Sequence, residues 1–111
     1  MHSRMRIKKG NLFTQIPASL AQELFEPLLE HEAIRIERIV SRGQSSPERG
    51  WYDQVQDEWV AVLRGGATLG FEDGNSIDLP PGDYLVIPAH CKHRVISTSS
   101  SSETIWLAVH Y

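Results

Sequence analysis

Short apolar segments separated by turn-forming residues follow one another along the C-terminal two thirds of the chain. β-Branched and aromatic residues are frequent in them, and the first segment alternates apolar and charged side chains over Ile34, Arg35, Ile36 and Glu37. Alternation with a period of two residues is typical of half-buried strands. We therefore predict strands over residues 33–41, 59–63, 67–71, 76–79, 84–88, 93–98 and 104–110.

The residues between these segments are those that tight turns prefer. Asp73-Gly74 predicts a hairpin, because this pair readily adopts the positive φ angles of a two-residue turn. Ile39-Val40 interrupts the alternation of its segment and predicts a β-bulge. About seven short strands with turns roughly every 6 to 12 residues predict an all-β fold, a sandwich or a small barrel.

One segment near the N-terminus has a different period. Leu20, Leu24 and Leu28 recur every four residues, which is the spacing of one face of a helix. Pro17 suits the first turn of a helix, and Pro27 ends or kinks it because proline lacks the N–H that the helix needs. We predict a short amphipathic helix of about two to four turns that covers one end of the sheet. A short strand within residues 1–16 precedes it.

The length and composition fit one globular domain. The chain has 111 residues, of which 41% are hydrophobic and 23% are charged, and this is enough for a single core but not for two domains. We divide the chain into an N-terminal strand and helix extension, residues 1–32, and a β-barrel core, residues 33–111.

Charge and cysteine content exclude several classes of protein. The net charge of −3 argues against a nucleic-acid partner, because proteins that bind nucleic acid are usually basic. No apolar run approaches the roughly 20 residues that span a bilayer, and no signal peptide is apparent, so we expect no membrane partner. The single cysteine, Cys91, cannot form an internal disulfide or a cysteine-rich zinc site, which fits a cytoplasmic protein.

The most informative segment is GDYLVIPAHCKHRVIS, residues 82–97. It resembles the second motif of the cupin family, G-x5-P-x-G-x2-H-x3-N, with Gly82, Pro88 and His93 in their places. His90 replaces the motif's second glycine, and Ser97 replaces its asparagine. The resemblance covers about residues 33–111 and implies a small double-stranded β-helix, or jelly-roll, barrel of the cupin type.

The first cupin motif, G-x5-H-x-H-x3–4-E-x6-G, is matched only in its second half, by Glu58 and Gly65. Its two histidines are missing. Counting back from Glu58 places them either on Tyr52 and Gln54 or on Trp51 and Asp53, depending on the register. The family's usual metal shell of three histidines and one glutamate therefore cannot form in this chain.

The resemblance still implies one divalent metal ion, Zn, Mn, Fe or Ni, in the barrel. Its candidate ligands are His93, Glu58 and one or both of Asp53 and Gln54, because imidazole, carboxylate and amide oxygen can bind these metals and leave positions open. The ion would act as a Lewis acid or activate water for a reaction on a small polar molecule. The alternative is a metal-free cupin that binds or senses a small molecule.

A barrel of this size holds one small ligand at its mouth. Tyr52, Trp51 and Trp106 are candidate pocket-lining residues, and His90 is a weaker one because it belongs to the turn before His93. His110 alternates with Trp106, and we interpret it first as a packing or surface residue. The family resemblance also implies a homodimer. The sequence does not decide whether the protein is an enzyme.

Overall fold

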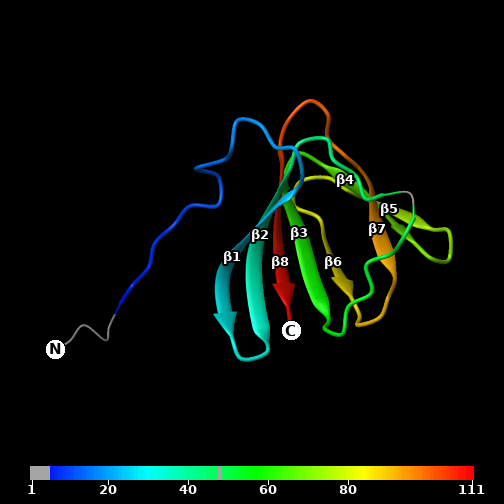
Figure 1. The fold of residues 1–111 in the computed structure, drawn as a ribbon, viewed down its shortest axis with the longest axis horizontal. Helices are drawn as coiled ribbons and strands as arrows, with labels where there is room; N and C mark the ends of the chain where they lie inside the picture. The colour runs from blue at the N-terminus through cyan, green and yellow to red at the C-terminus, as the bar shows by residue number, and fades with distance from the viewer. Residues whose placement is uncertain (1–5, 48) are drawn as a thin grey trace.

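The structure is a computed structural model that describes residues 6–47 and 49–111. The described residues form eight β-strands in two sheets (Figure 1). The strands are β1 (Leu24–His31), β2 (Ile34–Ser41), β3 (Glu58–Arg64), β4 (Ala67–Phe71), β5 (Ser76–Leu79), β6 (Tyr84–Ile87), β7 (His93–Thr98) and β8 (Thr104–His110). The predicted all-β fold is confirmed, and each strand of the predicted barrel core is present.

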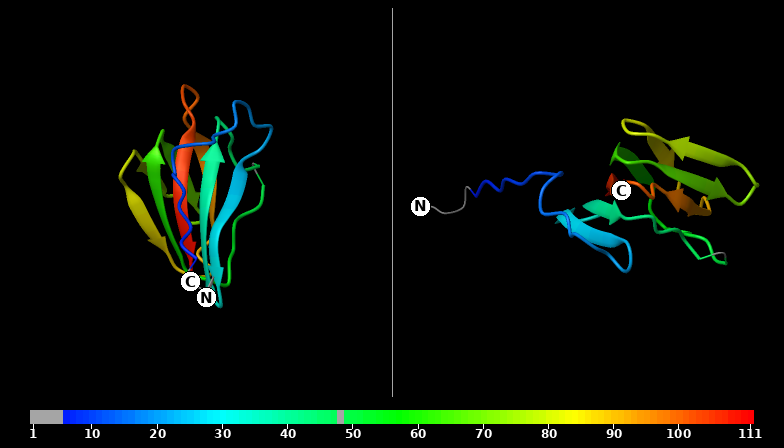
Figure 2. Two further views of the ribbon diagram at one scale, coloured as in Figure 1. Left: turned by 90° about the vertical axis from the view of Figure 1, so that its left-hand side faces the viewer. Right: turned by 90° about the horizontal axis from the view of Figure 1, so that it is seen from above.

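The larger sheet has the order β1-β2-β8-β3-β6, and the smaller has the order β5-β4-β7. Every pairing between these strands is antiparallel. Figure 2 shows the two sheets as separate layers, with the N-terminal segment running away from them. The buried apolar side chains lie between the layers and come from both sheets: Ile39, Val60, Val62, Ala67, Leu69, Leu79, Ile87, Val95, Trp106 and Ala108.

The predicted N-terminal helix is wrong. Residues 16–23 have no helical turn, and Leu24 and Leu28 belong to β1, which pairs with β2. Pro27 is tolerated there because β1 is the edge strand of its sheet, where a missing N–H need not break a ladder. The strand predicted within residues 1–16 is also absent from residues 6–16, and residues 1–5 lie outside the described part.

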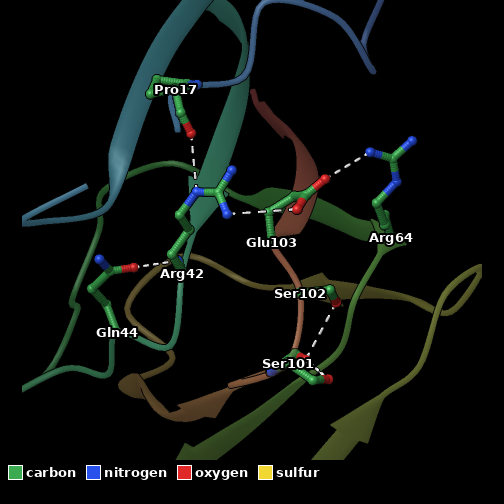
Figure 3. Close-up of polar contacts among 8 residues, drawn as sticks. Pro17, Arg42, Gln44, Arg64, Ser101, Ser102 and Glu103 are labelled. Carbon is green, nitrogen blue, oxygen red and sulfur yellow. Dashed lines mark hydrogen bonds and ion pairs between the residues drawn. The ribbon is translucent and has the colours of Figure 1, made fainter. Parts of the chain in front are cut away.

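We call residues 11–20 the N-terminal strap. It is held by Arg38 of β2 and by Arg42, which directly follows β2. The Arg38 guanidinium donates hydrogen bonds to the backbone carbonyls of Leu12, Thr14 and Gln15. Arg42 Nε donates to the Pro17 carbonyl at 3.0 Å, as Figure 3 shows. These carbonyls are therefore satisfied by arginines rather than by the N–H groups of a helix.

The predicted bulge at Ile39-Val40 is wrong as well. The pairing of β2 with β8 runs without interruption from Arg35 to Ser41. Alternation is lost there because β2 is buried on both faces: Ile39 is 7% exposed and Val40 is 0% exposed. Arg38 and Val40 lie on the outer face of β2, on the side that the N-terminal strap covers.

An ion-pair network joins the ends of β2, β3 and β8. Glu103 accepts a hydrogen bond from Arg64 at 2.8 Å and lies 3.7 Å from Arg42 (Figure 3). A hydrogen bond from its own backbone, and next the bond from Arg64, lower the pKa of the Glu103 carboxyl. The strap, which Arg42 also binds, is thus tied to the same end of the molecule as this network.

The turn between β3 and β4 depends on a glycine. Gly65 has a φ of +83°, and a Cβ at this position would lie 2.5 Å from Thr104 Oγ1 and 2.6 Å from the Glu103 carbonyl oxygen. Gly74, in the β4–β5 turn, has a similar φ of +91° but no atom within 4 Å of that point. A side chain at Gly74 would therefore meet backbone strain alone, whereas one at Gly65 would meet backbone strain and a steric clash.

We predict that Gly74→Ala lowers the free energy of unfolding by about 1–2 kcal/mol, the usual cost of a left-handed conformation for a residue with a Cβ. Gly65→Ala is predicted to cost about 1–3 kcal/mol more, because the new methyl group also displaces the start of β8. Urea unfolding of both variants measures the difference. Equal losses of unfolding free energy in the two variants would show that the close contact with Thr104 and Glu103 adds no cost, and would contradict the prediction.

Candidate functional site

A cavity of about 540 Å³ lies between the two sheets. The side chains of one face of each strand line it, since alternate residues of a strand point to the same side. β1, β2, β3, β6 and β8 contribute from the larger sheet, and β4 and β7 from the smaller. Its polar and charged lining residues are Glu23, Glu30, Arg35, Glu37, Tyr52, Gln54, Glu58, His93 and His110.

The segment before β3 runs antiparallel to the start of β7. The Tyr52 N–H donates to the His93 carbonyl at 2.8 Å, and the His93 N–H donates to the Tyr52 carbonyl at 3.2 Å. This pairing turns the side chains of Tyr52 and Gln54 into the cavity, whereas Trp51 and Asp53 do not line it. Of the two registers that the sequence left open, the one with Tyr52 and Gln54 inside is observed.

His93 is buried, with 8% of its side chain exposed, at the start of β7. Its Nδ1 lies 2.9 Å from the carbonyl oxygen of Cys91. A carbonyl can only accept, so Nδ1 carries the hydrogen, and in the neutral ring Nε2 presents a lone pair. Nε2 lies 3.7 Å from Glu58 Oε1, which is too far for a hydrogen bond. The Tyr52 ring packs beside the imidazole, with centroids 5.6 Å apart.

Glu58 begins β3 and is 7% exposed. It pairs with Ile87 of β6 on one side and with His110 of β8 on the other. Gln54 Nε2 donates a hydrogen bond to Glu58 Oε1 at 3.2 Å. Its neighbour Asp57 points elsewhere and accepts a hydrogen bond from the Ala89 N–H at 2.8 Å. Glu58 and His93 therefore face the cavity together, with no lysine or arginine of the described residues paired with either.

Two of the predicted site residues form a separate pair outside the cavity. His90 Nδ1 lies 2.8 Å from Asp53 Oδ1, and 65% of the His90 side chain is exposed. The residue has a φ of +61°, which turns its side chain away from the barrel. Trp51 is 38% exposed and packs under the Arg94 guanidinium at 5.0 Å. None of these residues lines the cavity.

A second buried imidazole and carboxylate were missed by the sequence reasoning. His110 Nε2 lies 3.0 Å from Glu37 Oε1, and both residues line the cavity. His110 is 3% exposed, so of its interpretation as a packing or surface residue the surface part is wrong and the packing part agrees with its burial. The alternation of strand residues could have identified His110 as a cavity residue, because it shares its face of β8 with Trp106, which also lines the cavity. Glu37 shares its face of β2 with Ile39 in the same way.

Glu23, between the N-terminal strap and β1, is a further cavity residue that the sequence did not reveal. It accepts a hydrogen bond from Ser41 Oγ, and Ser41 Oγ accepts one from Trp106 Nε1 at 3.0 Å. Burial raises the pKa of the Glu23 carboxyl, although the bond from Ser41 opposes this. Burial, and next the charge of Glu23, raise the pKa of Tyr52, so its hydroxyl stays protonated near neutral pH.

Comparison with protein families places the fold. The family model described as Cupin domain matches residues 38–110. The chain belongs to the cupins. The matched range includes the second half of β2 and all of β3 to β8, and therefore both buried histidines of the cavity. No curated protein matches this cupin.

Solved structures give the same fold. A Ralstonia eutropha JMP134 protein, described provisionally as a mannose-6-phosphate isomerase, is 48% identical over 94% of this chain and 97% of that chain, with a TM-score of 0.91. A cupin superfamily protein from Desulfitobacterium hafniense DCB-2 is 25% identical over 86% and 82%, with a TM-score of 0.70. A cupin protein from Desulfovibrio desulfuricans is 19% identical over 95% and 97%, with a TM-score of 0.73, and shows the fold alone.

The donor set of this cupin fits a tightly held divalent metal poorly. Among residues 6–47 and 49–111 no three or more His, Cys, Asp or Glu side chains lie close enough to hold an ion. His93 and Glu58 offer one nitrogen and one carboxylate, Gln54 adds an amide, and Asp53 is turned toward His90. Protein metal sites for these ions generally use at least three protein ligands.

Residues 6–47 and 49–111 contain no helix that could cross a membrane.

We predict that Glu23→Gln raises the melting temperature at about pH 8, where an ionised Glu23 is most costly to bury. Because burial raises its pKa, the folded chain holds this proton more tightly than the unfolded chain. The cost is therefore full above the folded-state pKa and disappears as the pH falls below the unfolded-state value. Thermal unfolding across this range should show the gain shrinking, while the exposed Glu72→Gln gives no such trend. A gain that does not change with pH would contradict the prediction.

Proposed function

We propose that this cupin binds a small molecule with hydroxyl or amine hydrogen-bond donors between Glu58 and His93, and that binding does not depend on a metal ion. One observation supports this proposal: two hydrogen-bond acceptors, His93 Nε2 and Glu58 Oε1, lie 3.7 Å apart in one cavity. Within the described residues, the Gln54 amide is the one hydrogen-bond donor to either atom, and it binds Glu58 Oε1.

The spacing suits a bridging donor. One ligand amine nitrogen can lie within about 2.9 Å of both acceptors and donate a hydrogen to each, whereas a hydroxyl has a single hydrogen and can donate to only one of them. Both side chains are buried, with 8% and 9% of their surface exposed, so a donor that satisfies them also relieves the cost of their desolvation. Tyr52 lines the same cavity, and its hydroxyl already has a hydrogen bond with Ser46.

A metal-dependent cupin is the second candidate. It is supported by the resemblance to the metal-binding motif at Glu58 and His93, which would be the two protein ligands, with Gln54 as a third. The 48% identical Ralstonia eutropha protein carries a provisional description as a mannose-6-phosphate isomerase, and this makes sugars candidate ligands. The donor set favours the metal-independent candidate.

The experiment compares two histidine variants of untagged protein treated with a chelator. His93→Asn keeps a donor for the Cys91 carbonyl but removes Nε2, and His90→Asn is the matched control outside the cavity. We expect chelated protein to show ligand-induced rises in melting temperature with a collection of polyols and amines. His93→Asn should abolish them and His90→Asn should leave them unchanged.

Metal analysis of the same untagged protein, made before the chelator is added, decides against the proposal if the second candidate is correct. Stoichiometric Zn, Mn, Fe or Ni that is lost in both His93→Asn and Glu58→Gln would replace it with the metal-dependent cupin. Ligand-induced rises that are equal in His93→Asn and in the unmodified protein would place the ligand elsewhere.

We also propose that this cupin forms a homodimer through the β1–β2 hairpin. Phe25, Leu28, Leu29 and Ile34 are between 43% and 51% exposed there, on and beside an edge strand. Exposed apolar edges of this kind are usually covered by another chain.

We predict a mass of about twice the 12.5 kDa of one chain in light scattering, and a monomer for Leu28→Glu, which places a charge in the contact. Ile77→Glu, at the edge of the smaller sheet, is the control and should stay dimeric. A monomeric unmodified protein would contradict the proposed homodimer.

A further inference from the structure

The charge of the cavity is strongly unbalanced. Of the described residues, four glutamates line it, Glu23, Glu30, Glu37 and Glu58, against a single arginine, Arg35. Arg35 is itself engaged, because its Nε lies 3.7 Å from Glu37 Oε2. The other lining residues are apolar or aromatic, apart from Tyr52, Gln54 and the two histidines.

We propose that the ligand of this cavity is an organic cation, a primary amine with an apolar body. The inference rests on the proposed binding function of Glu58 and His93 and names the class of molecule that they would take. It differs from the class suggested by a sugar phosphate isomerase, whose substrate carries a phosphate.

The ammonium group fits between Glu58 and His93. An ammonium has three N–H donors and a full positive charge. One hydrogen would meet Glu58 Oε1 and a second would meet the lone pair of His93 Nε2, which faces the cavity with no hydrogen-bond donor among the described residues. A charged donor also supplies the counter-ion that the buried Glu58 carboxylate lacks, and hydrogen bonds between charged groups are the stronger ones.

The rest of the cavity suits an apolar body rather than a second polar group. Aliphatic side chains form its inner wall, and the rings of Tyr52 and Trp106 border it: the aliphatic residues are Ile39, Val60, Leu69, Ile87 and Val95. Trp106 is 3% exposed, and its indole N–H is already satisfied by Ser41. The aromatic faces therefore attract a cation and its hydrocarbon chain, but they offer no donor to an anion.

The Glu37–His110 pair also favours a cation over an anion in the cavity. Glu37 is 7% exposed and lies on the β2 side of the cavity, where it binds His110. Carboxylates within a partly enclosed cavity focus a negative potential that concentrates cations and repels anions. Burial is the main cause of the raised pKa of Tyr52, and the charges of Glu23 and, less, of Glu58 act in the same direction.

A phosphate would meet the opposite conditions. Phosphate groups are held by arginine forks, by lysine ammonium groups and by backbone N–H groups. In the part of the chain that the structure describes, Arg35 is the one such side chain on the cavity wall, and it faces Glu37. Binding of a sugar phosphate would therefore bring two negative charges beside several carboxylates.

The test measures binding to chelated protein by titration calorimetry with three molecules of nearly equal shape: 2-phenylethylamine, 2-phenylethanol and 3-phenylpropanoate. Tyramine, cyclohexylamine and 1,5-diaminopentane extend the set of amines, and mannose and mannose 6-phosphate represent the rival class. We expect at least one amine to bind at least about tenfold more tightly than the neutral and anionic probes.

Two charge-neutralising variants locate the effect. Glu58→Gln, which keeps the shape of the side chain, should weaken amine binding at least about tenfold. Glu72→Gln, which removes the same charge from an exposed turn near Lys92, should leave binding unchanged. Because a Glu58 variant could lose structure, its thermal unfolding is compared with that of the unmodified protein, and weaker binding by a folded variant supports the inference.

The outcomes separate the ligand class from the binding function. Tighter binding of 2-phenylethanol or mannose than of every amine, lost in His93→Asn, overturns the cation while the proposed function stands. Preference for 3-phenylpropanoate or mannose 6-phosphate overturns the cation as well. If none of the amines binds at millimolar concentration, the inference is wrong; if no molecule of the wider collection binds either, the proposed function fails with it.

Discussion

The position of β8 between β2 and β3 is the constraint on which the cavity depends. β8 pairs antiparallel with both neighbours. Its alternation places Trp106, Ala108 and His110 on the same side of the sheet. The same alternation directs Glu37 from β2 and Glu58 from β3 to that side, so three strands place ionisable groups on one wall. A slip of one residue would turn all of them to the outer face.

The buried charged groups around the cavity distinguish it from a defect of packing. Glu37, Glu58, His93 and His110 are each at most 7% exposed. Burying such groups costs stability unless they find partners. Glu37 and His110 satisfy one another in part, whereas His93 and Glu58 stand 3.7 Å apart. The second pair is where a bound molecule could supply the missing hydrogen bonds.

The opposite end of the molecule has a different role. Arg38 and Arg42 hold the N-terminal strap through its carbonyl groups, and Glu103 joins Arg42 to Arg64. The strap ends beside Glu23, which enters the cavity wall and accepts a hydrogen bond from Ser41. The segment outside the matched cupin range therefore completes the site, and it does so through side-chain contacts with β2.

The sequence by itself determined the strands of the barrel and the cupin resemblance, and it singled out Glu58 and His93 as candidates, because period-two alternation and motif spacing are local properties. Tertiary structure alone decided the remainder. The four-residue spacing of leucines failed as a helix signal because pairing with β2 and contacts with arginines outweighed it. The choice of Tyr52 and Gln54 over Trp51 and Asp53 followed from the backbone pairing of Tyr52 with His93. The Glu37–His110 pair joins residues 73 positions apart, and only the order of strands in the sheet brings such residues together.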